Sequence, residues 1–414
     1  MNTKSLKVWI DNVESGTLAQ ESQRKHVFAY SPEAQDAVSL TMPIRLEGWA
    51  MPELHPVFQM NLPEGALLEA IRRAIAKLIG DSDMSILAAT GGNQIGRNRF
   101  TLPGAGGANK DVKPESLEEL LTYPDTEELF SELVSRYAIR SGVSGVQPKV
   151  LLEAKERGTF ATGSYIVKSW NDEYPCLAAN EFFCMTAAKR AGLDVPDFFL
   201  AQNGGLFVMR RFDRGAGGER LGFEDMCSIQ ALGTAQKYRG TYERVAKSLK
   251  NYISGECLPK ARRQFFATLV LSSMVQNGDA HLKNFGVLYP ETGGTISIAP
   301  VYDIVTTTAY IKNDVPALTI DGRKKWWPRK MLEVYATSHL SLPIGEVGDI
   351  ISNMADAVME TRQTIPTYIA DHPEFRKVGE CMMEHWARGT QGFFPDISIS
   401  MSERQAEAES FGPR

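Results

Sequence analysis

The residues of this chain whose types and spacing could do chemistry are an aspartate, an asparagine and a second aspartate. Asp279 and Asn284 lie five positions apart in the segment NGDAHLKN at 277–284, and Asp303 follows further along. ATP-dependent phosphoryl transfer uses this order, because one carboxylate orients the attacking hydroxyl while an amide and a second carboxylate hold magnesium. Mg²⁺ suits such hard oxygen ligands, since it takes few protein ligands and completes its shell with phosphate and water oxygens.

A buried helix should position the first of these residues. The long apolar run within 261–276 predicts that helix. Asn277 and Gly278 predict its end, because both residues tolerate a left-handed backbone. We therefore expect Asp279 just past the end of a rigid element.

A β-hairpin should bring the other two residues to the same place. Residues 285–289 and 295–299 read as two strands separated by a turn that contains proline and glycine. An antiparallel return places Asn284, before the first strand, near Asp303, after the second. Both should then lie at the open end of the hairpin, close to Asp279.

A lysine inside an apolar strand could supply a cation to this site. Lys168 lies in the predicted strand 165–169, and burying a lysine is costly unless it meets an anion. In kinases the usual partners are an ATP phosphate and a helix carboxylate, and Glu181 in the predicted helix 177–190 offers the carboxylate. The alternative is an edge-strand lysine that points to solvent.

Two flexible segments flank this strand. The loop 141–149 holds two glycines and two serines, and small residues let backbone N–H groups turn inward on phosphate oxygens. Most loops of this composition are only turns. Further along, the strand 206–209 leads through Arg210 and Phe212 into a glycine-rich crossover, where a two-lobed kinase has its hinge. An ordinary linker between lobes is the alternative.

Taken together in their order, these segments resemble a known family. The set comprises GVSGVQPK at 142–149, IVK at 166–168, NEFF at 180–183, RRFDR at 210–214, NGDAHLKN at 277–284 and YD at 302–303. The chain resembles the HipA-type serine/threonine kinases, which are bacterial toxins of toxin–antitoxin modules with a phosphoinositide-kinase-like fold. Segments 6–10, 16–18 and 61–65 extend the resemblance to the small N-terminal subdomain of that family.

The resemblance implies a role for each matching residue. Asp279 matches the catalytic aspartate, and Asn284 and Asp303 match the magnesium ligands. The ATP-binding residues that it implies are Val143, Ser144, Gly145, Val146, Gln147, Lys168, Glu181, Arg210, Phe212, His281 and Lys283. A packing histidine at 281 and a solvated surface lysine at 283 are the alternatives for those two positions.

A serine in the phosphate loop is a candidate for autophosphorylation. The serine that some family members phosphorylate aligns with Gly142, whereas a second loop serine of other members matches Ser144. We therefore expect autophosphorylation at Ser144, with Ser141 as the poorer candidate. A phosphate of charge about −2 on Ser144 would compete with ATP phosphates for the loop amides and so act as an off switch.

Composition narrows the class of protein. The 414 residues allow two or three domains, and a net charge of −5 gives no electrostatic footprint for unaided nucleic-acid binding. The five cysteines form no CxxC pair and no zinc spacing, which indicates reduced thiols in a cytoplasmic protein. No apolar run reaches membrane-spanning length, and no apolar signal region opens the chain.

The expected fold is α+β, and the resemblance implies its form. We expect a two-lobed, phosphoinositide-kinase-like kinase fold with three parts. These are a small α/β N-terminal subdomain over 1–110, a strand-rich ATP-binding lobe over 111–215 and a mostly helical lobe with the catalytic hairpin over 216–414.

The predicted function is that of an ATP- and Mg²⁺-dependent serine/threonine protein kinase. The resemblance implies a toxin whose protein substrate is an aminoacyl-tRNA synthetase, and a helix-turn-helix antitoxin as partner. It also implies contact with DNA only through that antitoxin. Two alternatives remain: a small-molecule kinase of the aminoglycoside or choline type, which also uses Asp-x4-Asn, and a catalytically silent co-repressor.

Overall fold

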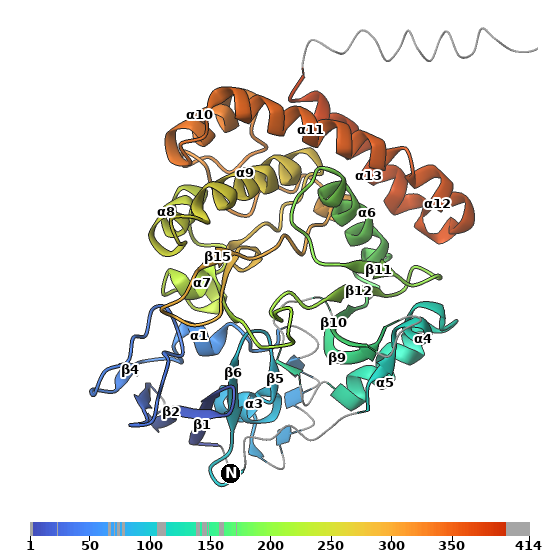
Figure 1. The fold of residues 1–414 in the computed structure, drawn as a ribbon. Coiled ribbons are helices and arrows are strands. Elements are labelled where there is room, and N and C mark those ends of the chain that lie inside the picture. Colours follow the sequence, from blue (N-terminus) through green and yellow to red (C-terminus); the bar gives the residue numbers. More distant parts are fainter. Residues whose placement is uncertain are drawn as a thin grey trace, which may run out of the picture.

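The structure is a computed structural model that mixes α-helices with largely antiparallel sheets, so the predicted α+β class is confirmed (Figure 1). It describes residues 3–22, 24–64, 68–69, 71–72, 75–76, 79–105, 113–137, 141–142, 147, 149–156, 161–170 and 172–394. None of the helices in these ranges is long and apolar enough to cross a lipid bilayer.

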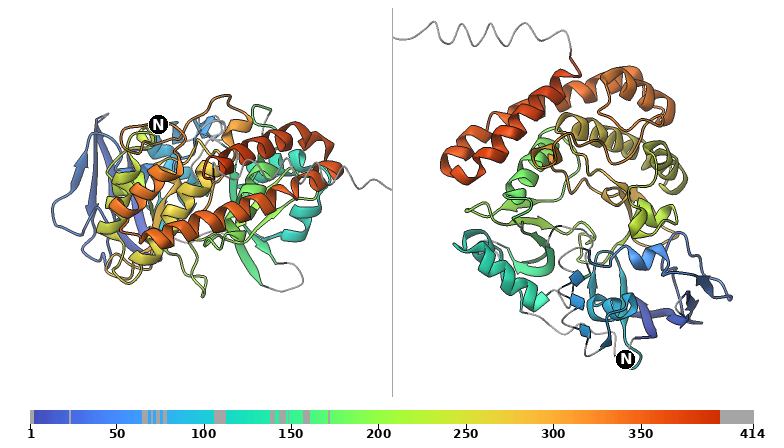
Figure 2. Two further views of the ribbon diagram at one scale, coloured as in Figure 1. Left: turned by 90° about the horizontal axis from the view of Figure 1, so that it is seen from above. Right: turned by 180° about the vertical axis from the view of Figure 1, so that it is seen from behind.

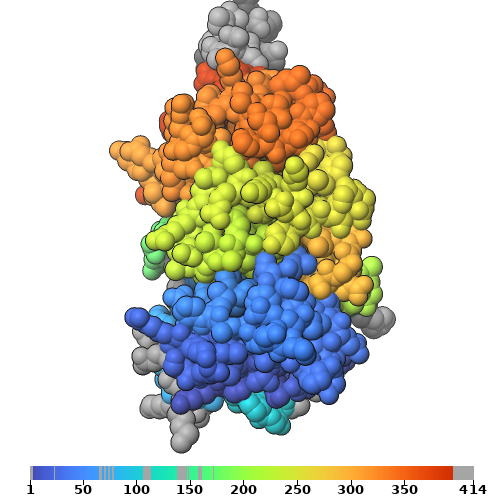
Figure 3. All heavy atoms as spheres, turned by 90° about the vertical axis from the view of Figure 1, so that its left-hand side faces the viewer, coloured from blue at the N-terminus to red at the C-terminus, as the bar shows by residue number. Residues whose placement is uncertain are grey.

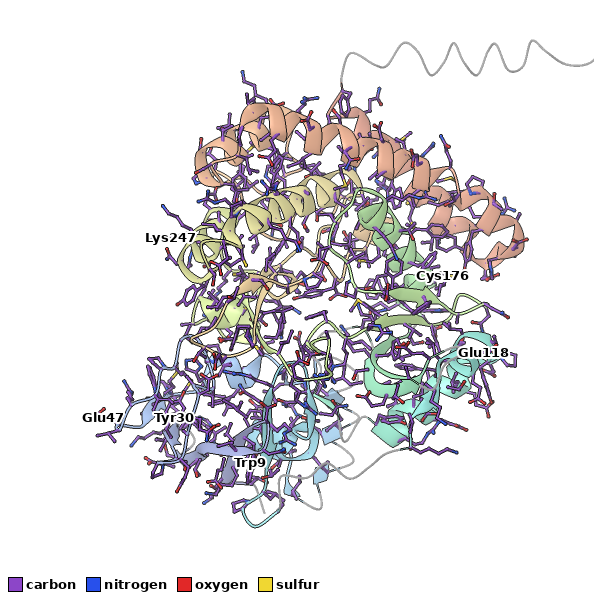
Figure 4. All side chains as sticks on the ribbon, viewed as in Figure 1. Trp9, Tyr30, Glu47, Glu118, Cys176 and Lys247 are labelled. Carbon is purple, nitrogen blue, oxygen red and sulfur yellow. The ribbon has the colours of Figure 1, made fainter. Side chains whose placement is uncertain are left out.

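A five-stranded sheet forms the N-terminal region. Its strands are β1 (Ser5–Ile10), β2 (Val13–Ser22), β3 (Lys25–Tyr30), β4 (Trp49–Met51) and β6 (Asn98–Thr101), in the order β4-β3-β2-β1-β6. Side chains alternate along β1, so that one face packs on α1 (Pro56–Gln59) and α3 (Asp83–Thr90). On this sheet, Trp9 and Tyr30 are labelled in Figure 4, and the Trp9 indole donates to Thr101 Oγ1 at 2.9 Å.

A second five-stranded sheet follows. Its strands are β7 (Glu115–Ser116), β9 (Lys149–Lys155), β10 (Thr162–Lys168), β11 (Phe198–Leu200) and β12 (Phe207–Arg210), in the order β11-β12-β10-β9-β7. One face packs on α4 (Leu117–Thr122) and α5 (Thr126–Tyr137). The other face packs on α6 (Leu177–Arg190).

Strand alternation decides which side chains reach which face of this second sheet. Val150 and Leu152 on β9 pack against α4 and α5, whereas Leu151 packs with the α6 side. On β10, Val167 and Ile166 divide in the same way. Because successive side chains point to opposite faces, Lys149 and Lys168 share the face of Leu151 and Ile166.

Several contacts join the N-terminal region to the rest of the chain, and two of them connect it to the neighbouring sheets. The short strands β5 (Asn93–Gln94) and β8 (Ser141–Gly142) pair in parallel and link the predicted N-terminal subdomain to the predicted ATP-binding lobe. Glu224, fully buried, accepts from Ser39 Oγ at 2.7 Å and from the Leu40 amide at 2.6 Å. The three regions therefore pack as neighbours, and Figure 3 shows the N-terminal region at one end of the molecule.

A small third sheet contains the predicted hairpin. It consists of β13 (Gly222–Asp225), β14 (Gly286–Tyr289) and β15 (Ser297–Ile298) in antiparallel order. Val287 pairs with Ile298 and Leu288 with Ser297. The expected hairpin is thus confirmed, although its second strand is shorter than the sequence indicates.

Helices make up most of the remaining chain. They are α7 (Met226–Ile229), α8 (Tyr242–Tyr252), α9 (Leu258–Met274), α10 (Arg329–His339), α11 (Ile344–Arg362), α12 (Ile365–Asp371) and α13 (Arg376–Gln391), with 3-10 turns at Thr234–Gln236, Leu282–Asn284, Thr307–Ala309 and Pro373–Phe375. The apolar helix α9 lies beneath α11 and α13, which run side by side in the view from above (Figure 2). Covering α9 in this way explains why every residue from Gln264 to Met274 is buried.

The predicted end of this helix is wrong in one detail. Helix α9 ends at Met274, and the left-handed residue is Gln276 with φ 53°, not Asn277 or Gly278. The Asn277 side chain instead accepts from the Asp279 amide at 3.0 Å. Asparagine favours such a local turn with its own side chain, which competes with the left-handed conformation that we expected.

Candidate active site

A cavity of about 370 Å³ lies where the N-terminal region, the second sheet and the hairpin meet. Its volume is in the range of small-molecule binding sites in proteins. Eight of the predicted site residues line it: Gln147, Lys168, Phe212, Asp279, His281, Lys283, Asn284 and Asp303. Residues from distant parts of the sequence therefore converge on one site.

Lys168 is held between two carboxylates. Its Nζ donates to Glu181 Oε1 at 2.5 Å and to Asp303 Oδ1 at 2.7 Å. The side chains of Lys168 and Glu181 are 3% and 0% exposed, whereas that of Asp303 is 32% exposed. The predicted pair of Lys168 with Glu181 is present, and the alternative of a lysine that points to solvent is wrong.

The charges in this cluster shift one another's pKa. Burial alone would lower the pKa of Lys168, but the carboxylates of Asp303 and Glu181 outweigh it and raise that pKa. Burial would likewise raise the pKa of Asp303, but the ammonium groups of Lys168 and Lys149 hold it well below the ordinary value. Both Lys168 and Asp303 are therefore charged at neutral pH.

The hairpin brings Asn284 to Asp303 as predicted. Asn284 Nδ2 donates to the Asp303 carbonyl at 3.3 Å. Asp303 has a left-handed backbone with φ 63°, a conformation that costs energy and that recurs at functional sites. Asn284 Oδ1 is buried and has no hydrogen-bond partner within the described ranges, so this oxygen is a candidate ligand atom.

Asp279 lines the cavity on a turn that hydrogen bonds hold in place. Its carboxylate side chain is 46% exposed, and Oδ1 accepts a hydrogen bond from the Tyr238 hydroxyl at 2.6 Å. The preceding Gly278 amide donates to Thr307 Oγ1 at 2.7 Å. A carboxylate that is both accessible and fixed suits a group that accepts a proton from an incoming hydroxyl.

His281 is buried beside this aspartate. Burial lowers the pKa of its imidazole, so the ring is neutral at pH 7. Its Nε2 lies 3.9 Å from Asp279 Oδ1, and the ring meets that of Tyr238 edge-on at a centroid distance of 5.0 Å. The histidine thus lines the cavity and packs against Tyr238, and its expected contact with ATP stays a prediction.

Lys283 is not a solvated surface lysine. Its side chain is 8% exposed, and its Nζ donates to Glu64 Oε1 and to the Met60 carbonyl, both at 3.1 Å. Lys237 binds the other oxygen of the same carboxylate at 2.7 Å. The N-terminal region therefore places Glu64 in the wall of the cavity between two lysines.

Of the two predicted hinge residues, one lines the cavity and the other does not. Phe212 lies in the wall and stacks on Tyr302 at a centroid distance of 4.9 Å. The Arg210 guanidinium instead binds Glu156 and lies 3.8 Å from Asp197. Alternation along β12 explains the correction, because Met209 faces the cavity and the next residue faces the opposite side.

The predicted phosphate loop is only partly described. Gln147 Nε2 donates to the Ser169 carbonyl at 3.0 Å, and the backbone of Ser141 and Gly142 pairs with β5. The remaining loop residues that we predicted, Val143, Ser144, Gly145 and Val146, lie outside the described residues.

The sequence did not identify several residues of the cavity. Lys149 is opposite Lys168 in the strand register and is 4% exposed, so a second ammonium group faces the same space. Burial lowers its pKa, while Asp303 opposes that effect. Alternation along the strand after the Gly/Ser loop was a signal for Lys149, whereas no local pattern marked Tyr238 or Glu64.

Comparison with family models identifies the family. A model described as the HipA-like C-terminal domain matches residues 141–362, and one described as the HipA N-terminal domain matches residues 6–101. The chain belongs to the HipA family. The resemblance seen in the sequence is thereby confirmed for both regions.

Individual proteins show how far this similarity extends. The chain is 30% identical over 226 residues to Y4dM of Sinorhizobium fredii, and 28% identical over 339 residues to Y4mE of the same organism, both named as candidate kinases. These matches cover 49% and 75% of this chain. They span 54% of the length of Y4dM, about half, and 79% of Y4mE.

A solved structure shares the fold. The HipA of Shewanella oneidensis MR-1, in a complex of HipA, HipB and operator DNA, is 21% identical with a TM-score of 0.66. The alignment covers 94% of this chain and 97% of that one. The architecture seen here therefore extends over nearly the whole of both chains.

Proposed function

We propose that the cavity binds ATP with Mg²⁺ and that this HipA-family protein is a serine/threonine protein kinase. The observation that carries the proposal is the buried Lys168, which binds both Glu181 and Asp303. The same cavity is lined by the solvent-accessible Asp279. Kinases use this combination of lysine, helix carboxylate, metal-binding carboxylate and catalytic aspartate. The two-lobed, phosphoinositide-kinase-like arrangement expected from the resemblance is part of the same proposal.

The residues present fit a nucleotide triphosphate. Lys149 and Lys168 give the cavity two buried cations for phosphate oxygens. Phe212 and Met209 give it an apolar wall for a base. Ile166 and Ile95 extend that wall.

The cavity residues also fit a magnesium ion whose binding depends on the nucleotide. No group of three or more His, Cys, Asp or Glu side chains suited to a metal occurs in the described part of the chain. Asn284 Oδ1 and the Asp303 carboxylate would be two protein ligands, with phosphate and water oxygens as the others. Such a site binds the ion well only when the nucleotide is present.

The chain's own residues suggest how transfer proceeds. Bound ATP would supply the phosphoryl group, and bound Mg²⁺ would neutralise part of its charge. Lys168, fixed by Glu181, holds phosphate oxygens at a set position. Asp279 orients the acceptor hydroxyl and takes its proton, while the neutral His281 excludes water beneath it.

The partners follow from the family and remain part of the proposal. The Shewanella oneidensis HipA was solved with HipB and operator DNA. We propose a helix-turn-helix antitoxin as partner for this chain, and contact with DNA only through it, because the net charge is −5. The proposed substrate is a translation factor such as an aminoacyl-tRNA synthetase, phosphorylated on a serine or threonine.

Labelled ATP tests the proposal directly. The purified protein is incubated with γ-labelled ATP, Mg²⁺ and a bacterial cell extract, and labelled peptides are identified by mass spectrometry. Asp279→Asn is the matched control, since it keeps the side-chain shape and removes the charge. Label on serine or threonine of a protein, lost in Asp279→Asn, supports the kinase, and label on Ser144 or Ser141 of this chain reveals autophosphorylation.

Other results would refute it. Label that appears only on small amines or alcohols would identify a small-molecule kinase. If no protein or small molecule is labelled and the chain does not bind Mg-ATP, the catalytically silent co-repressor is the function that the result supports.

A further inference from the structure

The catalytic aspartate proposed above is already hydrogen-bonded to a hydroxyl group. Tyr238 Oη donates to Asp279 Oδ1 at 2.6 Å, and the Tyr238 side chain lines the cavity at its mouth. An acceptor hydroxyl must make this same contact to be deprotonated during transfer. The phenol therefore occupies one of the two Asp279 oxygens that an acceptor hydroxyl could use.

Tyr238 is held in this place by its neighbours. Its ring lies edge-on to His281, and the Lys237 ammonium lies 5.5 Å from its centroid. The Lys237 carbonyl accepts from the Leu282 amide at 3.1 Å, which ties the segment to the backbone of the catalytic loop. At the same time Tyr238 is 46% exposed, so part of its ring faces solvent.

The Tyr238 hydroxyl remains protonated, and so remains a hydrogen-bond donor, at neutral pH. Burial raises the pKa of Tyr238, and the Asp279 carboxylate raises it further. The hydroxyl is thus protonated at neutral pH, and a hydrogen bond to a charged carboxylate is among the stronger ones in proteins. The contact persists until another donor with additional binding energy replaces it.

We infer that Tyr238 is a positioning residue that selects protein hydroxyls over water as phosphoryl acceptors. A protein acceptor binds through many contacts and can displace the phenol from Asp279, whereas a water molecule has no such contacts. In the competing hydrolysis, water would attack the γ-phosphorus, the bond to the β–γ bridging oxygen would break, ADP would leave and the proton would go to Asp279. With the phenol on Oδ1, only Oδ2 of Asp279 is left to take that proton. This inference rests on the proposed kinase function.

Hydrolysis of Mg-ATP without any protein acceptor tests the inference. Tyr238→Phe keeps the ring on His281 and removes only the hydroxyl. We expect its kcat for hydrolysis to rise about 10-fold, the factor that one hydrogen bond to a charged group is worth, with an unchanged KM for ATP. Tyr123→Phe, the same change at an exposed tyrosine outside the cavity, should leave both constants as in the parent.

The result that overturns the inference is equally specific. A Tyr238→Phe variant that hydrolyses ATP at the parental rate, or more slowly, shows that the phenol does not restrain Asp279. Damage to the fold lowers a rate and does not produce the expected gain. A parent that neither binds nor hydrolyses Mg-ATP overturns the proposed function, whereas an active parent with an unchanged Tyr238→Phe variant overturns this inference alone.

A second measurement follows the contact itself. With 3-fluorotyrosine placed at 238, the ¹⁹F resonance should shift in Asp279→Asn and stay in place in Asp321→Asn, an exposed site outside the cavity. Equal spectra for the parent and Asp279→Asn would show that the hydrogen bond is absent in solution and would refute the inference.

Discussion

Removal of the buried ammonium group is the perturbation whose effect is best defined by the structure. Lys168→Met keeps an unbranched side chain of similar length and leaves Glu181, which is 0% exposed, without its partner. An unpaired carboxylate cannot remain charged at such a site, because burial penalises its ionised form. We expect Glu181 to take up a proton in this variant.

The cost of that proton sets the magnitude. In the unfolded chain a glutamate has a pKa of about 4.3, so holding it protonated costs about 1.4 kcal/mol for each pH unit above that value. At pH 7 the cost is about 3.7 kcal/mol, and at pH 5 it falls to about 1 kcal/mol. The sign follows because burial raises the pKa of Glu181 in the folded state. The Lys168→Met variant is therefore more stable at low pH and loses that stability as pH rises.

Urea unfolding of four proteins at pH 5 and pH 7 measures the effect. They are the parent, Lys168→Met, Glu181→Gln and the double variant, and the double variant has no ionisable group at either position. We expect Lys168→Met to be less stable than the double variant by about 3.7 kcal/mol at pH 7 and by about 1 kcal/mol at pH 5. A gap of equal size at both pH values, or no gap at all, would show that Glu181 is not a buried charge that depends on Lys168.

Three further predictions concern other parts of the site. Gly278→Ala places a Cβ 2.0 Å from Asp314 Oδ2, so we expect a loss of about 1–3 kcal/mol in unfolding free energy and a larger loss of phosphotransfer, measured by urea unfolding and by γ-labelled ATP. Glu64→Ala leaves two lysines facing each other and should cost about 2 kcal/mol, whereas Glu47→Ala, at the outer edge of the N-terminal sheet (Figure 4), should cost less than about 0.5 kcal/mol. Ser144→Asp should weaken Mg-ATP binding in calorimetry, and unchanged affinity would rule out the switch at that serine.

The sequence predicted the parts of the site that local patterns control. The lysine inside an apolar strand pointed to an anionic partner, and Glu181 is that partner at 2.5 Å. The two strands around a turn pointed to a hairpin that joins Asn284 to Asp303. In each case the cost of burying a charge, or the geometry of a turn, is readable from a few neighbouring residues.

The parts that the sequence missed depend on long-range packing. Tyr238 precedes Asp279 by 41 residues, and Glu64 precedes Lys283 by 219, so no periodicity connects either pair. The Arg210 side chain lies outside the cavity for another reason, since successive side chains of a strand point to opposite faces, and its expected contact with ATP stays a prediction. Its neighbour on the cavity side is the uncharged Met209.

The position of Glu64 has a consequence for how the two HipA regions depend on each other. Its carboxylate, supplied by the region matched over 6–101, separates Lys237 and Lys283 at 2.7 and 3.1 Å. Without that region, Lys237 and Lys283 would face each other with no carboxylate between them. The remaining chain would also lose the part of the cavity wall that this region supplies. Conversely, a molecule that binds the N-terminal region and shifts Glu64 would also move Lys283, and it would do so without entering the cavity.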